Sequence, residues 1–241
     1  MDESGTPNPL TGTVRELAHH VVSALTSGGH APVSAATAVT LGDDDLGLAA
    51  VRVVGADVLL PSVLHRTAPA PVDLAVCEKA VLAYPPGADA SPTSLWSHWA
   101  MTRTLRDLGA PAALASGGAP DGDGTEPGAA WLEDLPWQAL GHQLALLAPL
   151  AVPAADSAVA RVARRRTVDV ARGFIRAVRR RGWLQAAGTG RWLSVLDDVP
   201  PSLGLDAGLE FVGLMGGDDP RVALHLHAAR LLRPADGRAA P

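Results

Sequence analysis

Apolar residues recur every three or four positions over several stretches of the chain, the spacing of an α-helix that buries one face. Residues 13–25 are the first example, and Thr13 with Glu16 predicts a capping box at the start of that helix. By the same criterion, helices are predicted over residues 71–84, 91–109, 129–150, 154–181, 183–197, 205–215 and 219–232.

This pattern predicts a mainly α protein built as a helical bundle. Residues 34–66 fit either a strand or a helix, so a small α/β or an irregular N-terminal half is left open. Gly, Pro and Asp concentrate in residues 116–129, a composition typical of a linker or loop. We therefore predict an N-terminal helical or mixed subdomain over 1–115, this linker, a C-terminal helical bundle over 130–233 and a disordered tail over 234–241.

One predicted helix has faces that differ sharply in charge. Placing residues 157–181 at 100° per residue puts Val170 and Phe174 on an apolar side and most of the arginines on the opposite side. No turn is evident between the two Arg triplets, so the segment is predicted to be one unbroken helix and not a helix-turn-helix. Gly173 inside it is expected to permit a close helix crossing.

The charge of this region is opposite to that of the chain as a whole. Residues 161–191 contain ten arginines and a single acid, Asp169, which we expect to pair with Arg165. This window carries +9, and because the net charge of the chain is −5, the remaining residues carry −14. Arginines four positions apart on a helix repel each other. The candidate anion-binding or partner-binding residues are Arg161, Arg165, Arg172, Arg176, Arg179, Arg180 and Arg191.

Three sources of neutralising charge are left open. The acids could belong to this chain, with residues 43–45, 133–134, 197–198 and 218–219 as candidates. They could belong to the acidic surface of a partner protein, or the charges could be phosphates of nucleic acid, nucleotide or lipid. The acidic chain disfavours a dedicated DNA-binding protein. The glycine-rich residues 186–192, which include Arg191, are predicted to form a turn and not a phosphate loop.

The composition indicates the cellular setting. The chain has one Lys, one Ile and one Asn among its 241 residues, and its cations are otherwise arginine, which is typical of a high-GC bacterial genome. Cys77 is the only cysteine, which excludes an intrachain disulfide and a cysteine-cluster zinc site. The polar N-terminus lacks a signal-peptide pattern, so a cytoplasmic location is expected.

No membrane span is predicted. Residues 144–155 are too short to cross a bilayer and contain two prolines. The longer apolar stretch over residues 46–64 is interrupted by Arg52, Asp57 and Pro61.

Catalytic motifs are not evident in the sequence. The spacings of a zinc protease, a P-loop and a serine-hydrolase elbow do not occur, so no catalytic residue, metal site or cofactor is predicted. We therefore predict a non-catalytic accessory or regulatory protein that binds a macromolecular partner, most simply an acidic protein surface, through the Arg-rich helix 161–181. The alternative is an enzyme that holds an anionic or phosphorylated small molecule with the same arginines. The pattern does not fix an oligomeric state.

Overall fold

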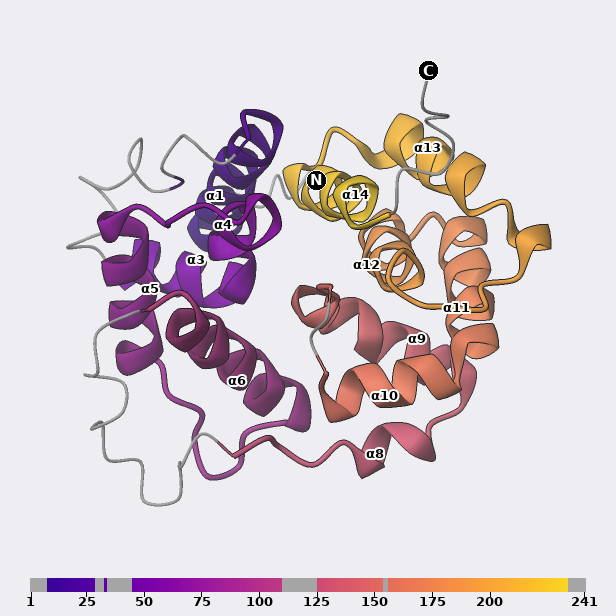
Figure 1. Ribbon diagram of the computed structural model, residues 1–241, viewed down its shortest axis with the longest axis horizontal. Helices are drawn as coiled ribbons and strands as arrows, with labels where there is room; N and C mark the ends of the chain where they lie inside the picture. The colour runs from indigo at the N-terminus through magenta and orange to yellow at the C-terminus, as the bar shows by residue number, and fades with distance from the viewer. Residues whose placement is uncertain (1–7, 29–32, 34–44, 110–124, 154–155, 234–241) are drawn as a thin grey trace, which may run out of the picture. The chain divides into compact units, whose positions relative to one another are not determined.

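The structure is a computed structural model that describes residues 8–28, 33, 45–109, 125–153 and 156–233. These residues are mainly α-helical and contain no strand, which confirms the predicted fold class (Figure 1). The predicted tail over 234–241 and most of the predicted linker lie outside the described residues. The domain boundaries stay a prediction.

The chain divides into two compact units by its internal contacts. Unit 1 comprises Met1–Ala88 and Ala100–Gly124, and unit 2 comprises Asp89–Trp99 and Thr125–Pro241. The helices described in unit 1 are α1 (Pro9–Thr26), α3 (Asp45–Val54), η1 (Gly55–Leu59), α4 (Leu60–His65) and α5 (Pro71–Ala83). Helix α6 (Pro92–Asp107) contributes its first residues to unit 2 and its remainder to unit 1. The other helices of unit 2 are α8 (Ala130–Glu133), α9 (Trp137–Leu146), η2 (Ala148–Leu150), α10 (Ala158–Arg165), α11 (Thr167–Arg179), α12 (Trp183–Leu193), η3 (Pro201–Leu203), α13 (Leu205–Gly216) and α14 (Pro220–Leu232).

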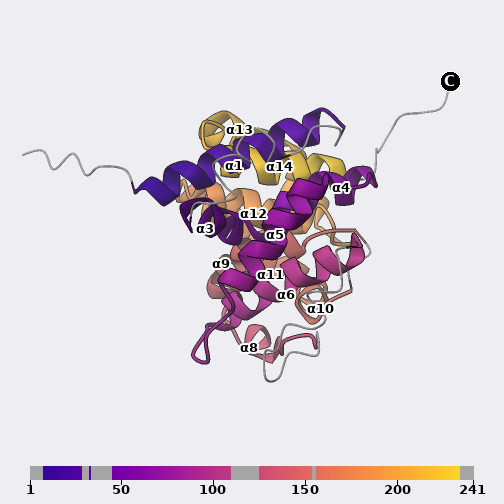
Figure 2. The same ribbon diagram turned by 90° about the vertical axis from the view of Figure 1, so that its left-hand side faces the viewer.

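Unit 1 is organised around α3, which packs against both α1 and α5 (Figures 1 and 2). The apolar stripe predicted for residues 13–25 is buried, with Leu17 and Val21 at 1% and 0% exposure. The helix begins earlier than the predicted capping box, because Asn8 accepts a hydrogen bond from the Leu10 amide at 3.0 Å. Pro9 then fits the first turn, where its missing N–H costs nothing.

The apolar stretch from Asp45 to His65 is long and apolar enough to cross a membrane by length and composition, with a mean hydropathy of 1.7. Core helices pass the same test, and 56% of this window is buried inside the protein. The stretch is divided into α3, η1 and α4, with Gly55 at a φ of 66° where the first helix ends. The finding is weak evidence for a span.

Two acids and the cysteine are buried in unit 1. Asp73 accepts a hydrogen bond from the Val33 amide at 3.1 Å, and Asp57 is 2% exposed. Burial raises the pKa of the Cys77 thiol, and the nearby charge of Asp73 raises it further. Because the thiolate is the reactive form, Cys77 is an inert core residue.

Unit 2 is built around α12, which packs against α9, α11, α13 and α14. All eight residues from position 186 to position 193 are buried. The Trp192 indole N–H donates to the Leu144 carbonyl of α9 at 2.7 Å. The predicted turn over residues 186–192 is therefore wrong, because this glycine-rich stretch is the middle of the central helix.

Small residues allow α9 to approach its two neighbours closely. A Cβ added at Gly173 would lie 3.1 Å from the Cα of Gly141, so α11 and α9 cross with their backbones in contact. A Cβ added at Gly188 of α12 would lie 2.8 Å from the carbonyl oxygen of Ala145 on α9. The close crossing predicted at Gly173 is confirmed.

The long Arg-rich helix is not continuous. It forms α10 and α11, which are separated at Arg166, where φ is −117° and ψ is 30°. The hydroxyl of Thr167 donates to the Arg164 carbonyl at 3.0 Å, which satisfies one acceptor at the end of α10. Ser157 caps the start of α10 by accepting from the Ala160 amide at 3.1 Å. The prediction of one unbroken helix is wrong.

Candidate functional site

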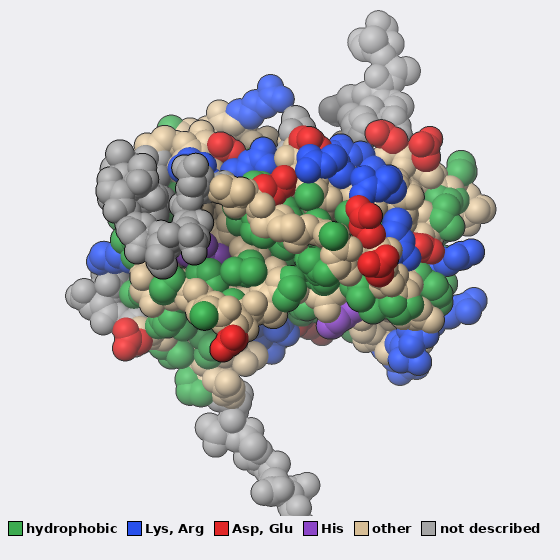
Figure 3. All heavy atoms as spheres, turned by 90° about the horizontal axis from the view of Figure 1, so that it is seen from below, with side chains coloured by type: hydrophobic (Ala, Val, Ile, Leu, Met, Phe, Trp, Pro, Cys, Tyr) green, Lys and Arg blue, Asp and Glu red, His purple; other side chains and the backbone are tan. Residues whose placement is uncertain are grey.

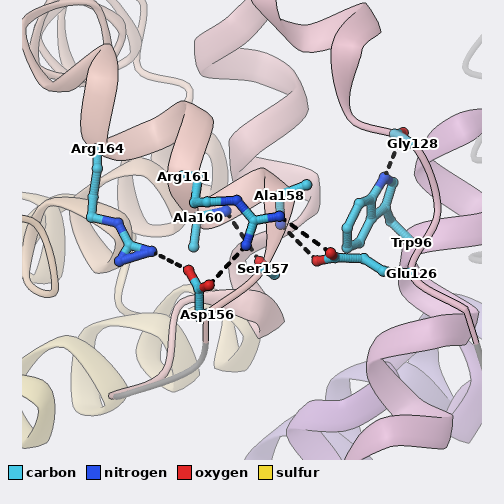
Figure 4. A network of polar contacts seen from close by, with 9 residues as sticks. All are labelled: Trp96, Glu126, Gly128, Asp156, Ser157, Ala158, Ala160, Arg161 and Arg164. Atoms are coloured by element: carbon cyan, nitrogen blue, oxygen red, sulfur yellow. Dashed lines mark hydrogen bonds and ion pairs between the residues drawn. The ribbon is translucent and has the colours of Figure 1, made fainter.

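Arg161 and Arg164 of α10 are neutralised by acids that precede this helix in unit 2. Asp156 accepts from Arg161 at 2.8 Å and from Arg164 at 2.7 Å, so it lies between the two guanidinium groups (Figure 4). These hydrogen bonds, chiefly that from Arg164, hold the pKa of Asp156 below its ordinary value. Glu126 accepts from the Ala158 amide at 2.6 Å and pairs with Arg161 at 3.4 Å.

The same network connects α10 to α6. Trp96 of α6 donates its indole N–H to the Gly128 carbonyl at 3.2 Å, two residues after Glu126 (Figure 4). The Trp96 ring is fully buried and meets Trp99 edge-on at 5.1 Å between centroids. Residues 125–128 are thereby held between α6 and α10, which fixes the position of Glu126.

The middle of the basic face also finds acids within the chain. Arg165 pairs with Glu133, and Arg172 pairs with Asp169 at 3.3 Å. Asp169 does not pair with Arg165 as predicted, because its second partner is Arg166 at 2.7 Å. In the right-hand half of Figure 3, acidic side chains (red) accordingly lie beside basic ones (blue).

Arg166 has a structural role that the helical pattern concealed. Its Nη1 donates to the carbonyl oxygens of Leu132, Glu133 and Leu135, at 3.2, 3.1 and 2.7 Å. Its Nε and Nη2 donate to Asp169 at 2.9 and 2.7 Å. The guanidinium therefore satisfies the carbonyl end of α8 while it holds the corner between α10 and α11.

Four arginines at and just after the end of α11 have no acidic partner among the described residues. We call Arg176, Arg179, Arg180 and Arg181 the Arg cluster. Across the ranges that the structure describes, no carboxylate lies within ion-pairing distance of these four side chains. Arg176 lies 5.7 Å from the centroid of the Trp137 ring, a cation–π contact, and the other three are exposed.

Arg191 does not belong to this surface. Its side chain is 0% exposed, its Nε donates to the Ala151 carbonyl at 3.3 Å, and its Nη1 lies 3.4 Å from Nδ1 of His225. The prediction that Arg191 contributes to a binding surface is therefore wrong. The helical pattern around it consists of alanine and glycine, which give no sign of which face is buried.

The predicted site residues thus fall into three groups. Arg161, Arg165 and Arg172 pair with acids of this chain, Arg191 is buried, and Arg176, Arg179 and Arg180 remain together with the unpredicted Arg181. Of the acids considered from the sequence, Glu133 is the one that pairs with this face in the described residues. Asp219 instead caps α14 and pairs with Arg221 at 2.6 Å.

Two aromatic residues near the Arg cluster, the partly buried Trp183 and the exposed Phe211, were not identified from the sequence. Trp183 is the first residue of α12, two positions after Arg181. Its ring meets the Phe211 ring of α13 edge-on, with 6.0 Å between centroids. The sequence did contain a pattern that could have predicted an apolar face on this helix, because residues 211, 214 and 215 are apolar at helical spacing.

A small hollow in unit 2 offers little to the alternative hypothesis of an enzyme. Its volume is about 190 Å³, and apolar residues including Leu150, Val152 and Trp192 line much of it. Its charged lining residues in the described chain, Asp156 and Arg164, pair with each other. Ligand pockets usually measure about 300–1,000 Å³. In the ranges described, no three metal-ligating side chains come together.

Comparison with known proteins adds no function to this geometry, since no family model, curated protein or solved structure matches the chain.

Proposed function

We propose that this protein is a non-catalytic accessory or regulatory protein that binds the acidic surface of a partner protein through the Arg cluster. The observation that carries the proposal is the contrast along one basic face. Arg161, Arg164, Arg165 and Arg172 each meet an acid of the chain, whereas the Arg cluster meets none in the described residues.

Unpaired arginines at adjacent helical positions repel each other, so an anionic partner would relieve a cost that the free protein bears. Arg176 and Arg180 stand four residues apart on consecutive turns. Guanidinium groups bind carboxylates through two parallel hydrogen bonds, which favours arginine for such an interface. The proposed setting, the cytoplasm of a high-GC bacterium, rests on the composition of the chain.

An acidic protein is favoured over nucleic acid for two reasons. The chain carries a net charge of −5, which opposes the approach of a long polyanion. The cluster also adjoins Trp183 and Phe211, and aromatic residues together with arginine are typical of the centres of protein interfaces.

The test compares two variants that remove the same charge from the same basic face. Arg179→Ser with Arg180→Ser removes arginines of the Arg cluster, for which the described residues supply no acid. The control, Arg165→Ser with Arg172→Ser, removes arginines that acids of the chain already neutralise. Binding of a fluorescent glutamate-rich peptide is measured by anisotropy at low and at physiological salt, beside single-stranded DNA of equal charge.

We expect the first variant to weaken peptide binding about tenfold and the control to weaken it less than threefold. Equal losses in the two variants would overturn the proposal, because the unpaired arginines would then have no special role. Tighter binding of the DNA than of the peptide would also overturn it, in favour of a nucleic-acid partner. Circular dichroism checks that both variants fold.

A further inference from the structure

A second feature of unit 2 lies next to the Arg cluster. Phe211, Leu214 and Met215, which we call the α13 patch, are 45%, 79% and 52% exposed. They stand at i, i+3 and i+4 on α13 and so share one face of the helix. The opposite face of α13 packs inside the protein, since Leu209 and Val212 are 4% and 0% exposed.

The α13 patch is more than scattered surface hydrophobicity. Its three residues are each close to half exposed or more and share one helix face, and contiguous apolar patches of this kind often mark binding sites. Single exposed leucines elsewhere in the chain, such as Leu82 and Leu146, are isolated in sequence from other large exposed apolar residues. The patch is a coherent face of one helix.

Trp183 joins the α13 patch to the Arg cluster. Its ring meets Phe211, and a Cβ added at Gly216 would lie 2.5 Å from its Cβ, so Trp183 lies directly against the last turn of α13. Arg180 and Arg181 form the turn that precedes it. Apolar surface and arginines without an acidic partner in the described part of the chain therefore adjoin each other across the start of α12.

We propose that the Arg cluster and the α13 patch form one docking surface, and that its occupant is an acidic amphipathic helix of a partner protein. The inference rests on the proposed function, since it assumes an acidic partner and adds its shape. A helix with apolar residues at i, i+3, i+4 and i+7 would cover the patch, while glutamates or aspartates along one edge would meet the arginines.

The charges around the patch favour such a helix over an anionic lipid surface. Glu210 is exposed immediately beside Phe211, and no ion pair to it is found among the described residues. A flat anionic membrane would place negative charge against this carboxylate as well as against the arginines. A helix can keep its acids on the edge that faces the Arg cluster.

The experiment uses the full chain and three probes. These are a helical peptide with leucines on one face and glutamates on the other, a peptide of the same composition in scrambled order, and vesicles of anionic and of neutral phospholipid. The variants are Leu214→Ser and, as a matched control, Leu146→Ser, an exposed leucine on α9 outside the patch. Sedimentation of the protein alone measures self-association.

We expect the amphipathic peptide to bind at least tenfold more tightly than the scrambled one. Leu214→Ser should remove most of that advantage, and Leu146→Ser should leave it unchanged. Equal binding of both peptides, with no effect of Leu214→Ser, would overturn this inference while the proposed function stands. Binding of neither peptide would overturn both proposals.

Two further outcomes would identify another occupant. Binding to anionic vesicles that depends on Leu214, without peptide binding, would replace the partner helix by a membrane surface. A dimer in sedimentation that Leu214→Ser dissociates would show that a second copy of the chain covers the patch. Either result overturns the inference.

Discussion

Arg166 is predicted to stabilise unit 2 more than any arginine of the exposed basic face. Arg166→Ala removes five hydrogen bonds, three to carbonyl oxygens and two to Asp169. The energies of these five hydrogen bonds do not add, because the three carbonyl oxygens share the two hydrogens of Nη1. In the variant, Asp169 also retains its ion pair with Arg172, at 3.3 Å. Hydrogen bonds to charged groups contribute about 1.5–3 kcal/mol, less where water can enter. The Arg166 side chain is 20% exposed, so we expect a loss of about 2–3 kcal/mol in the free energy of unfolding.

Tryptophan fluorescence in urea provides the assay for this loss. All six tryptophans lie within the residue ranges of unit 2, so their emission reports the unfolding of that unit. The control is Arg165→Ala, since Arg165 and its partner Glu133 are both more than half exposed and such pairs contribute about 0–1 kcal/mol. If the two variants lower the unfolding free energy equally, within about 0.5 kcal/mol, Arg166 does not hold the corner and the reasoning is refuted.

Three further predictions follow from packing and charge. Gly188→Ala should destabilise unit 2 by about 2–4 kcal/mol and Gly173→Ala by about 1–2 kcal/mol, in the same urea assay, because the added methyl groups meet backbone at 2.8 and 3.1 Å. The control is Gly213→Ala on α13 of unit 2, where the nearest atom to the added methyl group is a side-chain carbon of Leu226 at 3.4 Å, and stabilities that do not fall below that of this control would contradict the prediction. The pKa of Asp156 is lowered from its ordinary value, so its ionised carboxylate should contribute to stability at neutral pH, and this contribution should be lost as the pH falls through the lowered pKa. The melting temperature of Asp156→Asn should therefore differ from that of the parent protein at pH 7 and converge with it in strong acid. A difference in melting temperature that persists in strong acid would exclude the carboxylate charge as its cause. Glu210→Gln should tighten binding of the amphipathic acidic peptide two- to threefold in the anisotropy assay, and unchanged affinity would place Glu210 outside the interface.

The helical character of the chain could be predicted because it is encoded locally. Val170 and Phe174 are buried as the helical pattern requires, at 0% and 2% exposure. The same pattern misplaced the start of α1, since the Asn8 cap and Pro9 outweigh the capping box expected at Thr13.

The break at Arg166 depends on information that local periodicity does not contain. Carbonyl oxygens more than thirty residues away, on Leu132, Glu133 and Leu135, bind its side chain and favour a bend over a continued helix. Two of the acids that neutralise α10 were not identified either. Glu126 lies in the segment predicted as a linker, and Asp156 lies inside the helix predicted over 154–181, whereas α10 begins only at Ala158.

Arg191 illustrates a different limit of sequence analysis. It follows a stretch of alanine and glycine whose hydrophobic periodicity is nearly flat, so no buried face could be read from it. Residues 186–190 are buried because their small side chains let the backbone of α12 approach that of α9 closely. The hydropathy of a residue does not report this kind of close approach.

The glycine contacts of α9 have a consequence for how this sequence chooses a single arrangement of helices. At Gly141 and Ala145, one turn apart, α9 touches the backbones of α11 and α12. Sliding α9 by one residue would replace Gly141 by Leu140 or His142, and Ala145 by Leu144 or Leu146, where the backbones of α11 and α12 lie closest to α9. Steric clashes thus disfavour other alignments of α9 against α11 and α12. In a core poor in aromatic residues, these close backbone contacts help to select one arrangement of the helices.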